Sequence, residues 1–121
     1  MILVDTSVWI DHFRSRSARL AALLEAGEAT THAFVIGELA CGNLRNREEI
    51  LSLLETLPRS TKAGDQEVLV LLDRRQLMGC GLGLIDMHLL ASCLIDRCQL
   101  WTSDKPLKVV AADLGIDGST G

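Results

Sequence analysis

Two acidic residues follow short apolar runs that are typical of strands. Asp5 comes directly after ILV at residues 2–4, and Asp104 closes the segment LWTSD at residues 100–104. A short apolar run suits a strand that is covered on both faces. Open parallel sheets place their ligand sites at the carboxyl ends of the strands, so both carboxylates are candidate functional groups.

Two further acids share a predicted helix face with apolar side chains. Glu38 lies on one face with Phe34, Val35 and Cys41, and Asp86 lies on one face with Leu89, Leu90 and Cys93. His88 and Ser92 form the polar stripe of the second of these helices. A carboxylate on an apolar face is costly unless it is paired, protonated or bound to a metal, so both acids need an explanation.

Four acids from four segments point to a shared site, although each has a simpler explanation when it is taken singly. Asp5, Asp86 and Asp104 could each cap the helix that follows. Together the four carboxylates would repel one another unless a divalent cation neutralised them. Oxygen ligands favour Mg²⁺ or Mn²⁺ over zinc, which prefers His or Cys. The pattern therefore predicts a metal site without specifying a reaction.

The elements that must position these acids alternate along the chain. Short strands are predicted at residues 2–4, 29–32 and 100–102, and helices at residues 6–13, 19–27, 35–42, 48–57, 65–78, 84–95 and 106–115. Thr6 or Ser7 is the expected cap of the first helix, and Asp65 that of the fifth. The consecutive apolar residues 68–72 predict a fifth helix with two buried faces. This alternation predicts one α/β domain over residues 1–121, built on a parallel sheet.

At these residues the sequence resembles the PIN-domain family, and within it the VapC-type toxins of bacterial toxin–antitoxin pairs. The resemblance runs over ILVDTSVWIDHFR, THAFVIGELACGNL, GLGLIDMHLLAS and LWTSDKPL, and so covers nearly the whole chain. It implies a central parallel sheet of about five strands flanked by helices. It also implies that the acids matching Asp5, Glu38, Asp86 and Asp104 hold one or two Mg²⁺ or Mn²⁺ ions. A hydroxyl residue belongs near such a site, and either Thr6 or Thr102 matches it.

The resemblance implies a single-strand-specific endoribonuclease that hydrolyses RNA phosphodiesters with metal-activated water. Asp5 and Asp86 are the expected direct ligands. The implied partner is a VapB-type antitoxin that brings an Arg or Lys into the acidic site, while its apolar residues dock around Trp9, Ile10 and Phe13. Apolar surface on helices 35–42 and 65–78, together with the resemblance, also predicts a homodimer.

Composition excludes several other classes. Of 121 residues 48% are hydrophobic, yet no apolar run is long enough to span a membrane and the amino terminus has no basic leader, so a cytoplasmic protein is expected. The net charge of −4 argues against nucleic-acid binding by bulk charge. Four cysteines show no zinc spacing and are expected to be reduced: Cys41, Cys80, Cys93 and Cys98. The loop GCGLG lacks the third glycine of a nucleotide fingerprint.

Three alternatives remain open at this point. A receiver-like phosphoryl-transfer domain expects a further acid beside Asp5, where Thr6 and Ser7 stand. A noncatalytic PIN-like module would be expected to lose some of the acids, and a free-standing RNA-processing nuclease would have no antitoxin. A histidine-based ribonuclease is disfavoured because His12, His32 and His88 fall on different segments without a partner pattern. Basic residues near the site, Arg14, Arg16, Arg19 and Lys105, either steer phosphates or are simply solvated, and Trp9 and Trp101 are expected to pack in the core.

Overall fold

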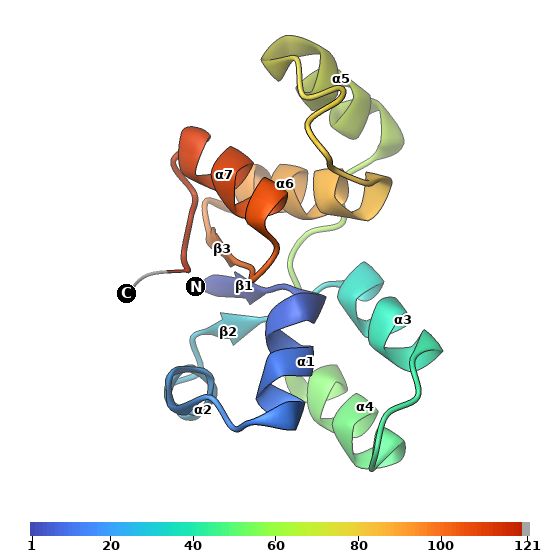
Figure 1. Ribbon diagram of the computed structural model, residues 1–121, viewed down its shortest axis with the longest axis vertical. Coiled ribbons are helices and arrows are strands. Elements are labelled where there is room, and N and C mark those ends of the chain that lie inside the picture. Colours follow the sequence, from blue (N-terminus) through green and yellow to red (C-terminus); the bar gives the residue numbers. More distant parts are fainter. Residues whose placement is uncertain (120–121) are drawn as a thin grey trace.

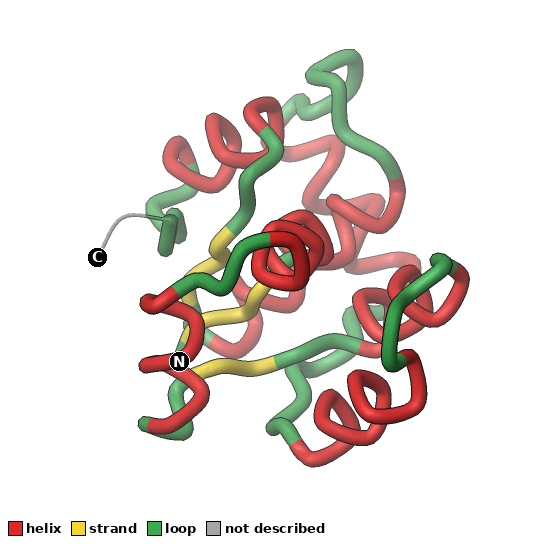
Figure 2. Tube along the Cα trace, turned by 60° about the horizontal axis from the view of Figure 1, so that its bottom comes forward, coloured by secondary structure: helices red, strands yellow, loops and turns green. Residues whose placement is uncertain are grey.

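The computed structural model describes residues 1–119, and its centre is a small parallel sheet. The strands are β1 (Ile2–Val4), β2 (Ala29–Thr30) and β3 (Gln99–Trp101), in the order β2-β1-β3. Both neighbours of β1 run parallel to it. Figure 2 shows the three strands side by side with helices around them. The central strand is covered on both faces, as its apolar sequence predicts, since Leu3 and Val4 have no exposed surface.

Seven helices surround this sheet within residues 1–119. They are α1 (Thr6–Arg14), α2 (Ala18–Glu25), α3 (Ala33–Cys41), α4 (Arg47–Thr56), α5 (Asp65–Arg75), α6 (Leu84–Asp96) and α7 (Lys105–Asp113). In Figure 1, α1 to α4 lie in the lower half of the view, on the side of β2, and α5 to α7 lie in the upper half, with α6 against β3 and α5 beyond α6 at the top. The α/β alternation predicted from the sequence is therefore confirmed.

The expected number of strands was too high. Within residues 1–119 the structure has three strands rather than about five, with one isolated parallel bridge beyond each edge of the sheet. Thr31 pairs with Arg59 at the β2 edge, and Leu100 of β3 pairs with Asp117 at the other. Each outer segment pairs through a single residue, so neither extends into a strand. β2 also ends before residue 32, because the His32 side chain caps α3 instead.

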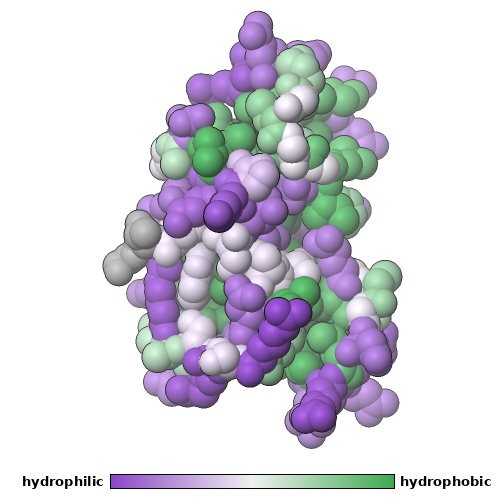
Figure 3. All heavy atoms as spheres, viewed as in Figure 1, coloured by the Kyte–Doolittle hydropathy of each residue, from purple (hydrophilic) through white to green (hydrophobic). Residues whose placement is uncertain are grey.

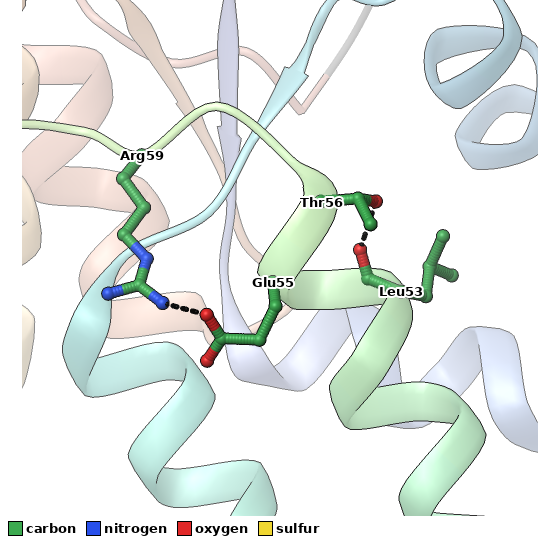
Figure 4. A network of polar contacts seen from close by, with 4 residues as sticks. All are labelled: Leu53, Glu55, Thr56 and Arg59. Carbon is green, nitrogen blue, oxygen red and sulfur yellow. Dashed lines mark hydrogen bonds and ion pairs between the residues drawn. The ribbon is translucent and has the colours of Figure 1, made fainter.

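The segment that carries the β2 edge bridge follows directly after α4. Thr31 N–H donates to Pro58 O at 2.9 Å, and Ser60 N–H donates to Thr31 O at 2.8 Å. Arg59 pairs with Glu55 of α4 at 2.6 Å, and nearby the Thr56 hydroxyl donates to a carbonyl of the same helix (Figure 4). Both partners of the ion pair are exposed, so the two backbone hydrogen bonds matter more for this edge than the ion pair does.

α5 departs from its sequence prediction. Only Val68 of the apolar run is fully buried, whereas Leu69 and Val70 are 49% and 45% exposed. The expectation of two buried faces is therefore wrong for the single chain, because α5 packs on α6 and has no second layer above it (Figure 1). Asp65 is also the first helical residue rather than the cap, which is Gly64.

α6 is buried more completely than its pattern indicated. Every residue from 87 to 93 is buried, including His88 and Ser92, so the predicted polar stripe does not face water. Ser92 Oγ lies 3.0 Å from Nε2 of His32, which satisfies both buried groups. No helix in the described part of the chain is long and apolar enough to cross a membrane.

Candidate active site

Asp5 lies at the end of the central strand and is nearly buried. Its backbone N–H continues the pairing with β3 by donating to Trp101 O at 2.9 Å. Asp5 is the N-cap residue of α1, but its side chain makes no capping hydrogen bond. Oδ2 instead accepts from Ser7 Oγ at 2.7 Å and from Thr102 Oγ1 at 2.8 Å. The capping explanation thus does not account for this carboxylate, which is 6% exposed.

Asp104 follows β3 and begins α7. Oδ2 of its side chain accepts from Leu107 N–H at 3.1 Å, so this acid does cap its helix. Its backbone N–H donates to Thr102 Oγ1 at 3.0 Å. The Thr102 hydroxyl therefore joins the ends of β1 and β3, because it donates to Asp5 and accepts from the backbone of Asp104. Asp104 itself is exposed at the surface of the site.

Glu38 is connected to the same end of the sheet through Thr6. Thr6 Oγ1 donates to Glu38 Oε1 at 2.8 Å and thereby links the first turn of α1 to α3. Glu38 is exposed, so the expectation that it points into a buried apolar face is wrong. The sequence left Thr6 and Thr102 as alternatives for one role, whereas the structure gives each hydroxyl a different carboxylate.

Asp86 lies in the first turn of α6 and is half-buried. Its Oδ2 accepts from Gly83 N–H at 3.0 Å, the backbone group just before the helix. Burial raises the pKa of Asp86, the Gly83 hydrogen bond opposes that rise, and the negative charges of Asp5 and Asp104 add to it. Three carboxylates from three segments thus share one electrostatic environment.

The carboxylate oxygens of this site are ligands of the kind that a hard cation prefers, but they do not yet lie close enough together to surround one. No three His, Cys, Asp or Glu side chains among residues 1–119 lie close enough to enclose a metal ion as they stand. The hydrogen bonds within the described chain reach only one oxygen of each of the four carboxylates. The second oxygen of each remains available, and an all-oxygen set fits Mg²⁺ or Mn²⁺.

Ser7 was not predicted as a site residue: the sequence offered it or Thr6 as the cap of α1, a position that Asp5 occupies. It donates to Asp5 Oδ2, lies 3.3 Å from Thr102 Oγ1 and accepts from Ser103 N–H at 3.0 Å. The only available signal is its place two residues after Asp5 on the strand-to-helix turn, where a short hydroxyl side chain can reach back to a carboxylate.

Two of the three histidines accept hydrogen bonds from backbone, whereas Nδ1 of the buried His88 has no hydrogen-bond partner among the described residues. Nδ1 of His32 accepts from Phe34 N–H at 3.0 Å and so caps α3. Nδ1 of His12 accepts from Ser17 N–H at 2.9 Å, after α1 has ended. Both rings therefore hold backbone at helix ends.

Arg19 stabilises the carboxyl-terminal segment. Its guanidinium lies 4.3 Å from the centre of the Trp101 ring and donates to the carbonyls of Gly118 and Ser119. Ser119 in turn exchanges hydrogen bonds with the backbone of Thr102. Arg19 is therefore engaged within the chain, whereas the other basic residues singled out from the sequence, Arg14, Arg16 and Lys105, are exposed.

The model of the PIN domain family matches residues 2–113. With its parallel sheet and its carboxylates at one end of the strands, the chain belongs to the PIN-domain family and is of the VapC toxin type. It is 48% identical over 117 residues to Ribonuclease VapC32 of Mycobacterium tuberculosis, and the match covers 96% of this chain and 94% of that protein. The VapC32 proteins of two strains of that organism match equally well.

Proposed function

We propose that this protein is a Mg²⁺- or Mn²⁺-dependent endoribonuclease and the toxin of a VapBC-type toxin–antitoxin pair, acting in the cytoplasm. The observation that carries the proposal is the carboxylate of Asp5, held at the end of β1 in an electrostatic environment shared with Asp86 and Asp104. The relative from Mycobacterium tuberculosis is named as a ribonuclease, which supports the choice of RNA as substrate.

The four acids have distinct roles in this proposal. Asp5 and Asp86 would hold the metal ion directly, with Glu38 and Asp104 as its outer partners. A divalent ion bound there supplies a nucleophile at neutral pH by lowering the pKa of water, and it polarises the phosphoryl oxygen. Cleavage then leaves a 3′-hydroxyl and a 5′-phosphate without using the ribose 2′-hydroxyl.

The hydroxyl side chains keep the carboxylates in position. Ser7 and Thr102 both donate to Oδ2 of Asp5, which restrains that carboxylate and leaves Oδ1 without a hydrogen bond from the described side chains. Thr6 does the same for Glu38 through a single hydrogen bond. Preorganised ligands of this kind need little rearrangement when a cation binds.

The direct test is cleavage of single-stranded RNA by the purified protein in Mg²⁺ or in EDTA. Mg²⁺-dependent cleavage that is lost in Asp5→Asn and retained in Asp73→Asn, an exposed acid of α5, supports the proposal. Cleavage that survives EDTA, or equal activity of Asp5→Asn and wild type, contradicts it.

The proposed antitoxin brings a cationic side chain to the carboxylates, where a guanidinium can pair bidentately with them. The docking surface expected around α1 needs correction, because Trp9 has no exposed surface and packs in the core. Ile10 remains exposed and Phe13 half-buried, so these two are the apolar contacts that α1 can offer. Without such a partner, the same site would describe a free-standing RNA-processing nuclease.

The proposed homodimer would use the exposed side of α5 and α6. A cavity of about 500 Å³ lies between these helices, with apolar walls that include Val70, Leu71, Ala91, Leu94 and Ile95. Hydrophobic atoms are visible in this region at the upper right of Figure 3. A second copy would cover the apolar surface that α5 leaves open in the single chain.

A further inference from the structure

A second cavity opens directly beside the candidate active site. It has a volume of about 430 Å³ and is lined by Phe34, Gly37, Glu38, Cys41 and Ile85, which together are called the Phe34 pocket below. The walls come from α3 and from the start of α6, two elements on the side of the molecule toward which β1 points (Figure 1). The volume falls in the range of sites for small organic groups. The pocket shares Glu38 with the carboxylate site, so any occupant lies next to that residue.

The aromatic wall is held in a fixed orientation. The backbone N–H of Phe34 donates to Nδ1 of His32, and the two rings lie 5.4 Å apart. The ring of His88 lies 4.8 Å from the Phe34 ring and perpendicular to it. Two buried histidines thus contact the ring of the half-buried Phe34. These contacts hold the ring in one orientation at the wall of the pocket.

Gly37 is unexplained by packing within the chain. A glycine inside a helix destabilises it relative to alanine, so its place in the interior of α3 needs a compensating reason. Apart from its two chain neighbours and the nearby backbone of α3 itself, no atom of the described chain lies within 4 Å of the position that a Cβ would take there. The space is therefore open, and close approach of a ligand to the backbone is one of the established uses of glycine.

A cation lies against the ring of Phe34, although it is not one of the residues that line the pocket. The Lys62 ammonium lies 4.7 Å from the centre of the Phe34 ring. The pocket thus combines an aromatic surface with an open strip of backbone at Gly37, and Lys62 adds a positive charge beside its aromatic residue. A flat apolar ring attached to an anion complements that combination.

We propose that the Phe34 pocket receives a nucleobase of single-stranded RNA, from the nucleotide that flanks the scissile phosphate, and that Lys62 contacts the adjoining phosphate. This inference rests on the proposed ribonuclease function. Any RNA cut beside Glu38 carries a base within reach of this pocket, because the base is covalently attached to the reacting phosphodiester through its ribose. Aromatic side chains are the usual platforms for such unstacked bases.

The proposal can be tested by two independent changes, one that fills the pocket of the protein and one that removes a base from the RNA. Gly37→Ala adds a Cβ that meets no neighbouring atom within 4 Å, Gly37→Leu places a larger apolar side chain at the same pocket wall, and Ser52→Leu adds that side chain at an exposed position of α4 as the matched control. The substrate is a short single-stranded RNA with an abasic nucleotide placed at each position in turn around the cleaved bond. Thermal unfolding of each variant shows that its fold is intact.

We expect Gly37→Leu to raise KM for intact RNA between about 5- and 150-fold with little change in kcat, the range of one stacked base. One abasic position should cause the same rise in the wild type, and combining the two changes should add nothing further. Additive effects, or wild-type KM in Gly37→Leu, overturn the proposal. So does a variant that cuts RNA normally but escapes inhibition by the antitoxin, since the pocket then holds a peptide side chain.

Failure of the proposed ribonuclease function can be distinguished from failure of the proposed base site. If the wild-type protein cuts no RNA in Mg²⁺, the ribonuclease assignment fails. Binding of the same labelled RNAs, measured by fluorescence anisotropy, then judges the pocket alone. Weaker binding of the abasic RNA and of Gly37→Leu still supports a base site, and equal affinities overturn it.

Discussion

The hydroxyl of Thr102 donates to Oδ2 of Asp5 across 2.8 Å, between residues 97 positions apart in the chain. Thr102→Val keeps the shape of this buried side chain but removes its hydrogen bonds. We expect a loss of about 1–3 kcal/mol of stability, because a buried carboxylate oxygen loses a donor. Cleavage should fall between about 10- and 100-fold, the usual cost of removing a partner of a metal ligand. Thr102→Ser retains the hydroxyl and should restore both, as urea unfolding and RNA cleavage assays can measure.

The acidic side chains of the site should lower the stability of the metal-free protein while being required for RNA cleavage. Burial and the neighbouring acids raise the pKa of Asp86, because they disfavour its charged form. Asp86→Asn removes that charge, so we expect the variant to have a higher Tm than the wild type in EDTA. Cleavage should fall by more than about 100-fold, beyond the effect expected of an outer partner. Mg²⁺ should raise the Tm of the wild type and not that of the variant. A wild-type Mg²⁺ response in Asp86→Asn would remove this residue from the metal site.

The antitoxin should depend on the same negative charge. Asp5→Asn should weaken binding of the co-encoded antitoxin, because a guanidinium loses its anionic partner. Asp113→Asn, an exposed acid at the end of α7, is the matched control and should bind normally. Isothermal titration calorimetry measures both affinities. Equal binding by the two variants would exclude the charge-pairing mode of inhibition.

Self-association should respond to the exposed face of α5. Val70→Glu places a charge in the apolar groove between α5 and α6, and the proposed dimer should dissociate at micromolar concentration. Val109→Glu, at a 60% exposed position of α7, is the control and should leave the dimer intact. Light scattering gives the mass directly. A wild-type protein that is monomeric in this assay would contradict the proposed dimer.

Acid should destabilise the start of α3. Burial lowers the pKa of His32, and the charges of His88 and Lys62 lower it further. The folded chain thus prefers the neutral ring, whose Nδ1 accepts from Phe34 N–H while its Nε2–H donates to Ser92. Stability from this group is complete above the unfolded pKa of about 6.5 and is lost as the pH falls through the lower folded pKa. His32→Asn, which retains a capping acceptor, should show a shallower fall in urea midpoint between neutral and mildly acidic pH.

Much of the fold follows from local patterns in the sequence. The strand at Ile2–Val4 and the positions of the helices rest on apolar runs and helix ends, such as Gly27, which adopts a positive φ of 70° just after α2. The carboxylates at the ends of β1 and β3 follow in turn, because two parallel strands bring their carboxyl ends together. Their role as metal ligands remains a prediction.

The sequence predictions of burial for α5 and α6 were wrong because burial depends on contacts with distant segments. His88 and Ser92 look like an outer polar stripe, yet both are buried. Ser92 finds a partner in His32, 60 positions earlier in the chain, and the ring of His88 packs against Phe34 of α3. Such a pairing leaves no trace in the periodicity of either segment. For α5 the difference is the opposite. Its apolar run predicts two buried faces, but no other part of the described chain covers its outer face.

The long sequence separation between Asp5 and Thr102 also has a consequence during protein synthesis. The carboxylate of Asp5 is made early, while the hydroxyl that fixes it is made 97 residues later, and the acid that follows β3 comes after that hydroxyl. At about 5–20 residues per second, that interval is on the order of 5 to 20 s. A nascent chain therefore cannot assemble its carboxylate site until Thr102 and Asp104 have been made. For a nuclease whose substrate is RNA, this order of synthesis delays activity beside the translating ribosome and leaves time for an inhibitor to be present first.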